Sequence, residues 1–173
     1  MSAPGPQRKA KTKRDDWETP PHIFKKLDDE FHFTLDAAAS PENAKVENYI
    51  TKEQDALHFP WINWYGDPLV VFLNPPYGKG LDKWVHKCYH EAWAYNTVVA
   101  LLPAVTDTKW FTEEIWKTAN EIRFVAGRIS FVGSTSGNTT GSMIAVWYPR
   151  PRPFLKKENT PKCSIWYQPQ KNA

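Results

Sequence analysis

A short apolar run that ends at two prolines constrains the fold of this chain more than any other feature. Residues 69–73 are rich in Val and Phe, and Asn74-Pro75-Pro76-Tyr77 follows them directly. The run is typical of a buried parallel strand, and the prolines end its hydrogen-bond ladder because proline has no N–H to donate. Open α/β sheets bind ligands at the carboxyl ends of such strands. We therefore expect a rigid polar loop at a ligand site.

Predicted strands and helices alternate along the rest of the chain. Apolar residues at helical spacing predict helices over about 20–31, 81–93 and 107–119, and we expect Thr19 and Asp107 to be N-caps. Shorter apolar runs predict strands at 32–36, 98–102, 121–126, 128–132 and 143–148. This order predicts an α/β fold with a mostly parallel sheet. No GxGxxG or P-loop motif is present, which disfavours a dinucleotide-dependent dehydrogenase or a nucleoside triphosphatase.

The chain's 173 residues fit one domain with a hydrophobic core. We expect a basic disordered tail over 1–14, a folded domain over 15–149, and a Pro-rich, basic C-terminal tail over 150–173 in which Ile165, Trp166 and Tyr167 could dock. There is no run of about 18 apolar residues and no secretory signal. Cys88 and Cys163 form no CxxC pair, so we expect a cytoplasmic protein with no membrane contact. The five His residues show no ligand spacing, so we expect no metal.

The formal net charge of +3 is unevenly distributed. Basic residues gather in two blocks that flank the folded part, at 8–14 and 150–157. Such blocks attract phosphate groups. They could equally be solvated tails that aid solubility.

The Asn-Pro-Pro-Tyr loop suits methylation of a planar amino nitrogen. The exocyclic amine of adenine is a poor nucleophile because its lone pair is delocalised into the ring. The Asn74 side-chain carbonyl and the Pro75 backbone carbonyl could accept its two hydrogens and free the lone pair, while Pro76 keeps the turn rigid. Tyr77 could stack on the base. The same loop would serve a protein glutamine, an RNA base or cytosine N4, and Asn-Pro-Pro can also be a simple strand-ending turn.

The chain resembles the phage-type DNA adenine-N6 methyltransferases, the Dam-like family. The resemblance implies a Rossmann-like methyltransferase domain over 15–149, whose mostly parallel sheet has an antiparallel final strand. It also implies S-adenosyl-L-methionine as the methyl donor and adenine in double-stranded DNA as the acceptor, reached by base flipping. It suggests GATC as a target and protection against host nucleases as a purpose. The matching motifs, in order, are 16–21 (DWETPP), 35–45 (LDAAASPENAK), 55–57 (DAL), 74–77 (NPPY), 101–104 (LLPA), 106–108 (TDT), 110–111 (WF), 123–124 (RF) and 127–131 (GRISF).

Site residues follow from these motifs. Asn74, Pro75, Pro76 and Tyr77 match the family's catalytic loop. Asp36 matches the acidic residue that holds the methionine part of the donor, and Asp55 the one that binds its adenine amine. Glu47, Glu53 and Asp55 compete for the donor's ribose hydroxyls, and small alanines replace the glycine-rich turn of broader methyltransferases. The donor-binding residues expected from the resemblance are Trp17, Thr19, Pro20, Asp36, Ala37 and Asp55.

Few residues are left over for a separate DNA-recognition region. The loops 57–68 and 134–141 are candidates, together with four expected DNA contacts, namely Lys79, Arg123, Arg128 and Asn138. The two arginines could instead lie at a sheet edge without binding phosphate. We expect a monomer or a weak homodimer. A non-catalytic nucleic-acid-binding protein that retains a decayed methyltransferase fold is the alternative from a different functional class.

Overall fold

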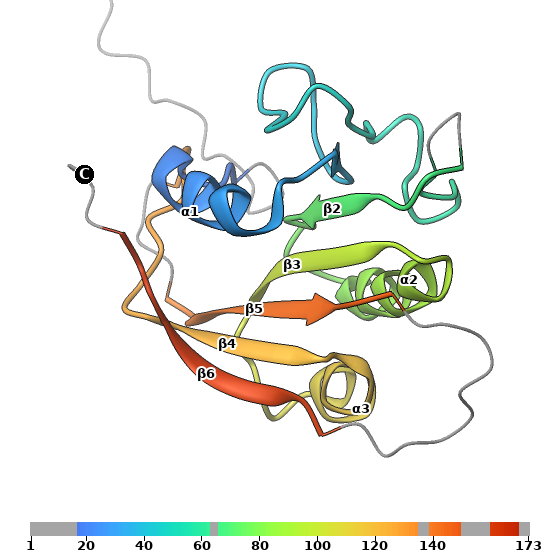
Figure 1. Ribbon diagram of the computed structural model, residues 1–173. Helices are drawn as coiled ribbons and strands as arrows, with labels where there is room; N and C mark the ends of the chain where they lie inside the picture. Colours follow the sequence, from blue (N-terminus) through green and yellow to red (C-terminus); the bar gives the residue numbers. More distant parts are fainter. Residues whose placement is uncertain (1–16, 63–65, 135–138, 150–159, 170–173) are drawn as a thin grey trace, which may run out of the picture.

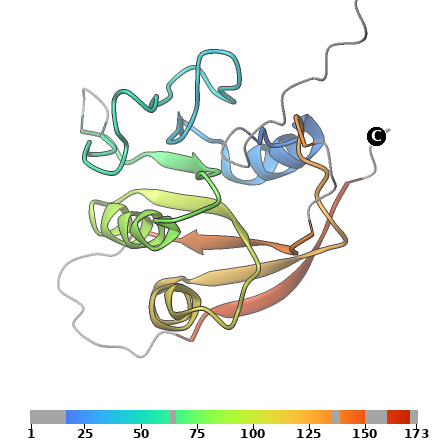
Figure 2. The ribbon, with the colours of Figure 1, turned by 180° about the vertical axis from the view of Figure 1, so that it is seen from behind.

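Six strands form one mixed sheet that carries helices on both faces (Figures 1 and 2). The computed structural model of the chain describes residues 17–62, 66–134, 139–149 and 160–169. The strand order across the sheet is β1-β2-β3-β5-β4-β6. The strands are β1 (Leu35–Asp36), β2 (Val70–Leu73), β3 (Thr97–Pro103), β4 (Glu121–Ala126), β5 (Ser142–Trp147) and β6 (Lys162–Tyr167). The helices are α1 (Pro21–Phe31), α2 (Leu81–Trp93), the π-helix η2 (Trp110–Ile115) and α3 (Trp116–Thr118).

The sheet is mostly parallel, as predicted. β1 pairs with β2, β2 with β3, and β4 with β6, all in parallel. Among the strands that the structure describes, β5 alone runs against the others, and it lies between β3 and β4. The strand expected at 143–148 is therefore antiparallel, but it lies inside the sheet and another strand follows it in the chain.

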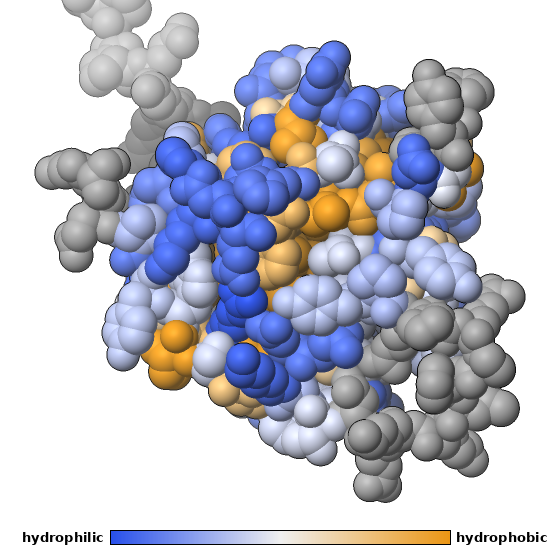
Figure 3. Space-filling model, viewed as in Figure 1, coloured by the Kyte–Doolittle hydropathy of each residue, from blue (hydrophilic) through white to orange (hydrophobic). Residues whose placement is uncertain are grey.

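Two apolar layers sandwich the sheet. Ile23 and Leu27 of α1 pack against one face, next to residues of β2, β3 and β5 such as Phe72. Residues of α2 and η2, such as Val85 and Ile115, pack against the other. Figure 3 shows hydrophilic residues gathered over α1 and hydrophobic ones beside it over the sheet. This one-sided burial is what an amphipathic helix requires.

Several predicted elements have different bounds in the structure. The strand expected at 32–36 is reduced to Leu35–Asp36. Residues 128–132 form no strand, and only an isolated bridge joins Val132 to Glu18. The helix expected at 107–119 is largely π-helical and lacks a side-chain cap, so Asp107 was wrongly expected to cap it, and Trp116 lies exposed. Thr19 does not cap α1 either, because Pro20 is the N-cap residue and no side chain caps this helix.

Strand β6 lies within the segment that was expected to be a loose tail. Residues 162–167 pair with β4 over six positions, from Glu121↔Lys162 to Ala126↔Tyr167. Trp166 is buried in the α1-side core, as expected, whereas Ile165 and Tyr167, which were also expected to dock, are exposed. Within the described residues, no helix is long and apolar enough to cross a lipid bilayer.

Candidate active site

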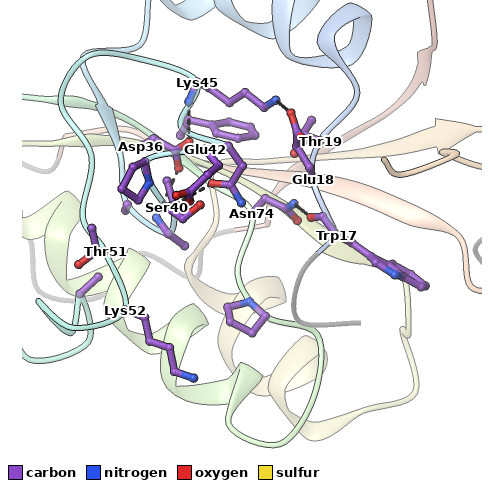
Figure 4. A pocket seen from close by; sticks show the side chains of 18 of the residues that line it. Trp17, Glu18, Thr19, Asp36, Ser40, Glu42, Lys45, Thr51, Lys52 and Asn74 are labelled. Atoms are coloured by element: carbon purple, nitrogen blue, oxygen red, sulfur yellow. Dashed lines mark hydrogen bonds and ion pairs between the residues drawn. The ribbon is translucent and has the colours of Figure 1, made fainter. Parts of the chain in front are cut away.

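A cavity of about 700 Å3 opens at the carboxyl ends of β1 and β2 (Figure 4). β1 and β2 are parallel, with Asp36 opposite Phe72. The segments that follow them therefore leave the sheet at the same end. Four parts of the chain wall the cavity: 17–19 before α1, 36–56 from the end of β1, the end of β2 with the Asn74 loop, and Trp84 of α2. A volume of this size suits a cofactor-sized ligand. Of the residues expected to bind the donor or act in catalysis, those that line it are Trp17, Thr19, Asp36, Ala37, Asp55, Asn74 and Pro76.

Asn74 is half-buried, and its amide is held in one orientation. Its Nδ2 donates to the backbone carbonyl of Trp17 at 3.0 Å (Figure 4). The flipped amide would set Oδ1 against that carbonyl, two acceptors facing one another, so the observed orientation is favoured. Oδ1 consequently remains an acceptor at the cavity wall.

The remaining residues of the loop have different surroundings. Pro75 is buried, whereas Pro76 is exposed and lines the cavity. The Tyr77 hydroxyl donates to the backbone carbonyl of Leu101 at 3.2 Å, and its ring meets Phe131 edge-on. Burial raises the pKa of Tyr77 above its usual value, so the phenol stays neutral. Tyr77 is not among the residues that line the cavity. Its expected stacking on a base stays a prediction.

Asp36 is a buried carboxylate at the floor of the cavity. Its oxygens accept from the backbone N–H groups of Lys45 at 3.1 Å and Ala38 at 3.4 Å. Burial raises its pKa to about 6, and these hydrogen bonds together with the positive charge of Lys45 only partly oppose that effect. An ionised carboxylate here is incompletely compensated by the protein, which favours a cationic ligand.

Thr19 presents a buried hydroxyl to the cavity without a partner. Among the residues that the structure describes, its Oγ1 is the one buried side-chain nitrogen or oxygen that makes no hydrogen bond. Such an unmet group costs about 1–3 kcal/mol. Across the cavity, Ala37, Ala38 and Ala39 supply small side chains that allow a ligand to approach the backbone. The cavity thus offers a ligand a polar contact and room beside it.

The other donor-binding candidates lie at the rim or outside it. Asp55 is exposed in a left-handed conformation (φ 53°), and its carboxylate accepts from the Leu57 N–H and pairs with His58 Nδ1 at 2.7 Å. This contact with His58 lowers the pKa of Asp55. Glu53 also lines the cavity, whereas Glu47 and Pro20 do not.

Sequence reasoning did not identify Glu18 and Lys45 as site residues, although both line the same cavity. Lys45 Nζ and Glu18 Oε1 form an ion pair of 2.6 Å (Figure 4). Both residues lie in motifs that carry the family resemblance, but the two motifs are far apart in the chain. No local pattern predicts a contact between them.

The four expected DNA contacts differ in their surroundings. Lys79, just after the Asn74–Tyr77 loop, and Arg128 are exposed. Arg123 instead forms two 2.7 Å bonds to the Glu30 carboxylate, pairs with Glu121, and is 12% exposed at its side chain. These partners raise the pKa of Arg123 and favour the sheet-edge role over phosphate binding. Asn138 lies outside the described residues, as does part of the loop 134–141.

A second cavity of about 570 Å3 lies beside α2 and contains none of the expected site residues. His86 and His90, one turn apart, face each other there with their Nε2 atoms 2.9 Å apart. We expected no ligand spacing among the five histidines, but these two lie four residues apart on one face of α2. In the part of the chain that is described, no three His, Cys, Asp or Glu side chains are arranged to hold a metal ion.

Comparisons with known proteins found a matching family and two similar phage proteins. The family described as DNA N-6-adenine-methyltransferase (Dam) matches residues 7–170. A DNA N-6-adenine-methyltransferase of Escherichia phage T1 is 32% identical over 153 residues, which cover 77% of this chain and 62% of the phage protein. Another of the same description, from Haemophilus phage HP1 (strain HP1c1), is 34% identical over 139 residues, 76% of each chain. The chain thus spans somewhat less than two thirds of the T1 protein's length.

Proposed function

Because this chain belongs to the DNA N-6-adenine-methyltransferase (Dam) family, we propose that its cavity binds S-adenosyl-L-methionine beside an adenine flipped out of double-stranded DNA. The parallel strands β1, β2 and β3, with the cavity at their carboxyl ends, support a Rossmann-like methyltransferase fold. The relatives are phage proteins, so we expect the reaction in the host cytoplasm, where the DNA lies. We expect a monomer or weak homodimer.

The residues of the cavity fit the chemical groups of this donor. When bound, S-adenosyl-L-methionine supplies an electrophilic methyl group on a sulfonium centre. Asp36 would accept hydrogen bonds from the donor's ammonium group, which supplies the positive charge that the buried carboxylate lacks. The partnerless hydroxyl of Thr19 would donate to a carboxylate or hydroxyl oxygen of the donor. The alanines after β1 leave room for it, and Glu53 and Asp55 are the carboxylates within reach of the cavity for ribose or adenine groups.

The observation that carries the proposal is the fixed amide of Asn74. With Nδ2 engaged by the Trp17 carbonyl, Oδ1 is left to accept a hydrogen from the adenine amine. The Pro75 carbonyl would accept the other hydrogen, which draws N6 toward a tetrahedral shape and localises its lone pair. N6 would then be positioned to take the methyl group that the donor supplies, with the donor's sulfur leaving as a neutral thioether and one N6 proton passing to water. Catalysis arises from positioning and fixed dipoles.

Other substrates of similar chemistry are less well supported. A protein glutamine, an RNA base and cytosine N4 also present a planar amine, but both relatives are described as acting on DNA adenine N6. A non-catalytic binding protein would have no need of an amide held in the acceptor orientation.

The test is methyl transfer from tritiated S-adenosyl-L-methionine to unmethylated duplex DNA, followed by nucleoside analysis. We expect label in N6-methyldeoxyadenosine. Asn74→Ala should lower kcat by about a thousandfold, by analogy with removal of one preorganised hydrogen-bonding group, while donor binding measured with S-adenosylhomocysteine stays intact. Equal methyl incorporation by wild type and Asn74→Ala, or label in cytosine, would contradict the proposal.

A further inference from the structure

Residues 17–19, which we call the strap, connect the separate parts of the site. The Trp17 carbonyl accepts from Asn74 Nδ2, and the Glu18 backbone exchanges two hydrogen bonds with Val132 (3.2 and 3.0 Å). The Glu18 side chain contacts Lys45 on the segment after β1. Trp17 also stacks on Phe131 at a ring distance of 5.7 Å. The strap therefore touches the catalytic loop, the donor-binding segment and the segment after β4.

Lys45 holds both the strap and the floor of the cavity. Its Nζ pairs with Glu18, while its backbone N–H donates to Asp36 Oδ2. The Lys45 and Glu18 side chains are 12% and 31% exposed, whereas the surface pair Lys25–Asp29 is 74% and 63% exposed. Because little water reaches Lys45, its attraction to Glu18 is weakly screened, and removing one partner leaves a poorly hydrated charge.

We propose that the Glu18–Lys45 ion pair is a latch that positions the strap, and through it the Asn74 amide and the Thr19 hydroxyl. Both are positioning residues, since their charges pair with each other and the groups they position make the proposed contacts. An open latch would let the strap leave Asn74, whose Nδ2 would lose the Trp17 carbonyl and whose Oδ1 could rotate from the adenine site. It would also move Thr19 from the donor. This inference rests on the proposed function of the cavity.

The test compares variants that remove each charge with little change in shape. Glu18→Gln and Lys45→Met each open the latch, and the Lys45 backbone N–H stays available to Asp36. We expect each to lower kcat on duplex DNA by about tenfold or more, as misplacement of a reacting group does, and to raise the dissociation constant of S-adenosylhomocysteine severalfold. The double variant should lose about as much as either single variant because the pair acts as a unit. Lys45→Arg, which retains the pair, should keep most of the activity.

The exposed pair supplies the matched control. Lys25→Met and Asp29→Asn remove charges of the same kind on the exposed side of α1, outside the cavity lining, and kcat should stay within about twofold. Activities are compared per folded molecule, from melting curves recorded on each variant. If folded Glu18→Gln and Lys45→Met retain wild-type kcat and donor affinity, or if their losses add in the double variant, the latch is wrong. If the wild-type protein itself binds no S-adenosylhomocysteine and transfers no methyl group, the proposed function fails instead.

Discussion

At the scale of single residues, the site depends on polar groups whose partners the fold has fixed or withheld. The Asn74 Nδ2 donates to the Trp17 carbonyl, whereas the Thr19 Oγ1 makes no hydrogen bond to the described residues. Asp36 is buried with two backbone donors and an incompletely compensated charge. Groups of this kind weaken the folded state when no ligand is present, and they are the ones a ligand can satisfy.

The first prediction concerns the cost of burying Asp36. Its pKa is about 6 in the folded protein against 3.8 ordinarily, so the folded state holds the proton at pH values where the unfolded state has lost it. The stabilisation from that proton is complete below about pH 4 and is lost as pH rises through 6, a difference of about 3 kcal/mol. Asp36→Asn should remove this fall in the free energy of unfolding between pH 4 and 7, as measured by urea denaturation.

The same substitution should weaken donor binding, because the amide carries no charge to pair with an ammonium group. In the wild type, affinity for S-adenosylhomocysteine should fall as pH drops below about 6. Asp29→Asn, at an exposed carboxylate, is the control and should leave both profiles unchanged. A wild-type stability profile that Asp36→Asn does not alter would contradict this assignment.

The second prediction separates the ring of Tyr77 from its hydroxyl. Tyr77→Phe removes only the hydrogen bond to the Leu101 carbonyl and should cost about 1 kcal/mol of stability, with a mild effect on kcat. Tyr77→Ala also removes the ring that packs against Phe131, and it should lower both stability and turnover strongly. Chemical denaturation and methyl-transfer assays measure both effects. Equal losses of turnover in the two variants would assign the role to the hydroxyl.

At the scale of helices and strands, Arg123 joins α1 to the sheet. Its guanidinium lies on β4, bonds Glu30 near the end of α1, and lies 5.2 Å from the centre of the Phe31 ring. Arg123 forms a bidentate ion pair with Glu30 of α1 and also pairs with Glu121 of β4. It therefore cross-links the helix to the sheet. Its positive charge is consequently engaged within the protein.

The third prediction follows from this cross-link. Arg123→Gln should lower the free energy of unfolding by about 1–2 kcal/mol, since the Glu30 side of the pair is partly exposed. It should leave the salt dependence of DNA binding unchanged. Arg128→Gln, at an exposed position, should do the reverse and reduce the slope of log K against log salt by about one. A reduced slope for Arg123→Gln would restore that residue as a phosphate contact.

Elements with a strong local signal could be predicted from the sequence, and those that depend on distant partners could not. The period of apolar residues predicted α1 and α2, and the apolar runs predicted β2, β3 and β5. β6 was missed as a strand because only Trp166 in it is buried, so alternation is absent and β4 supplies the pairing. At the cavity, Asn74 was predicted because it directly follows a strand and Asp36 because of the family resemblance, and both residues line the cavity. Glu18 and Lys45 could not be predicted, because their contact exists only after folding.

At the scale of the whole molecule, we expect ligand binding and stability to be coupled through the strap. The segment 17–19 has no regular structure beyond a bridge to Val132, so its order depends on contacts with the cavity walls. A donor that contacts both Thr19 and Asp36 would connect the strap to the sheet. Such a ligand binds the folded state alone and therefore stabilises it.

The fourth prediction measures this coupling. S-adenosylhomocysteine at a hundred times its dissociation constant should stabilise the protein by about 2.7 kcal/mol, seen as a higher Tm. Thr19→Val replaces the hydroxyl with a methyl group of similar size. It should raise the ligand-free Tm, since an unmet buried hydroxyl is removed, and reduce the shift that the ligand produces. An unchanged shift in Thr19→Val would show that this hydroxyl does not meet the ligand.

The reversed direction of β5 limits where the chain can vary in length. Since β3 and β4 both run against β5, the chain that follows Ala126 leaves the sheet at the end where Asn74 lies, and Val132 in it pairs with Glu18. Ile129 and Phe131 of this segment are buried in the α1-side core, so insertions or deletions that spare the core must lie after Val132. Length changes confined to that stretch would keep the Glu18–Val132 bridge and, beyond it, the Trp17 carbonyl that orients the Asn74 amide.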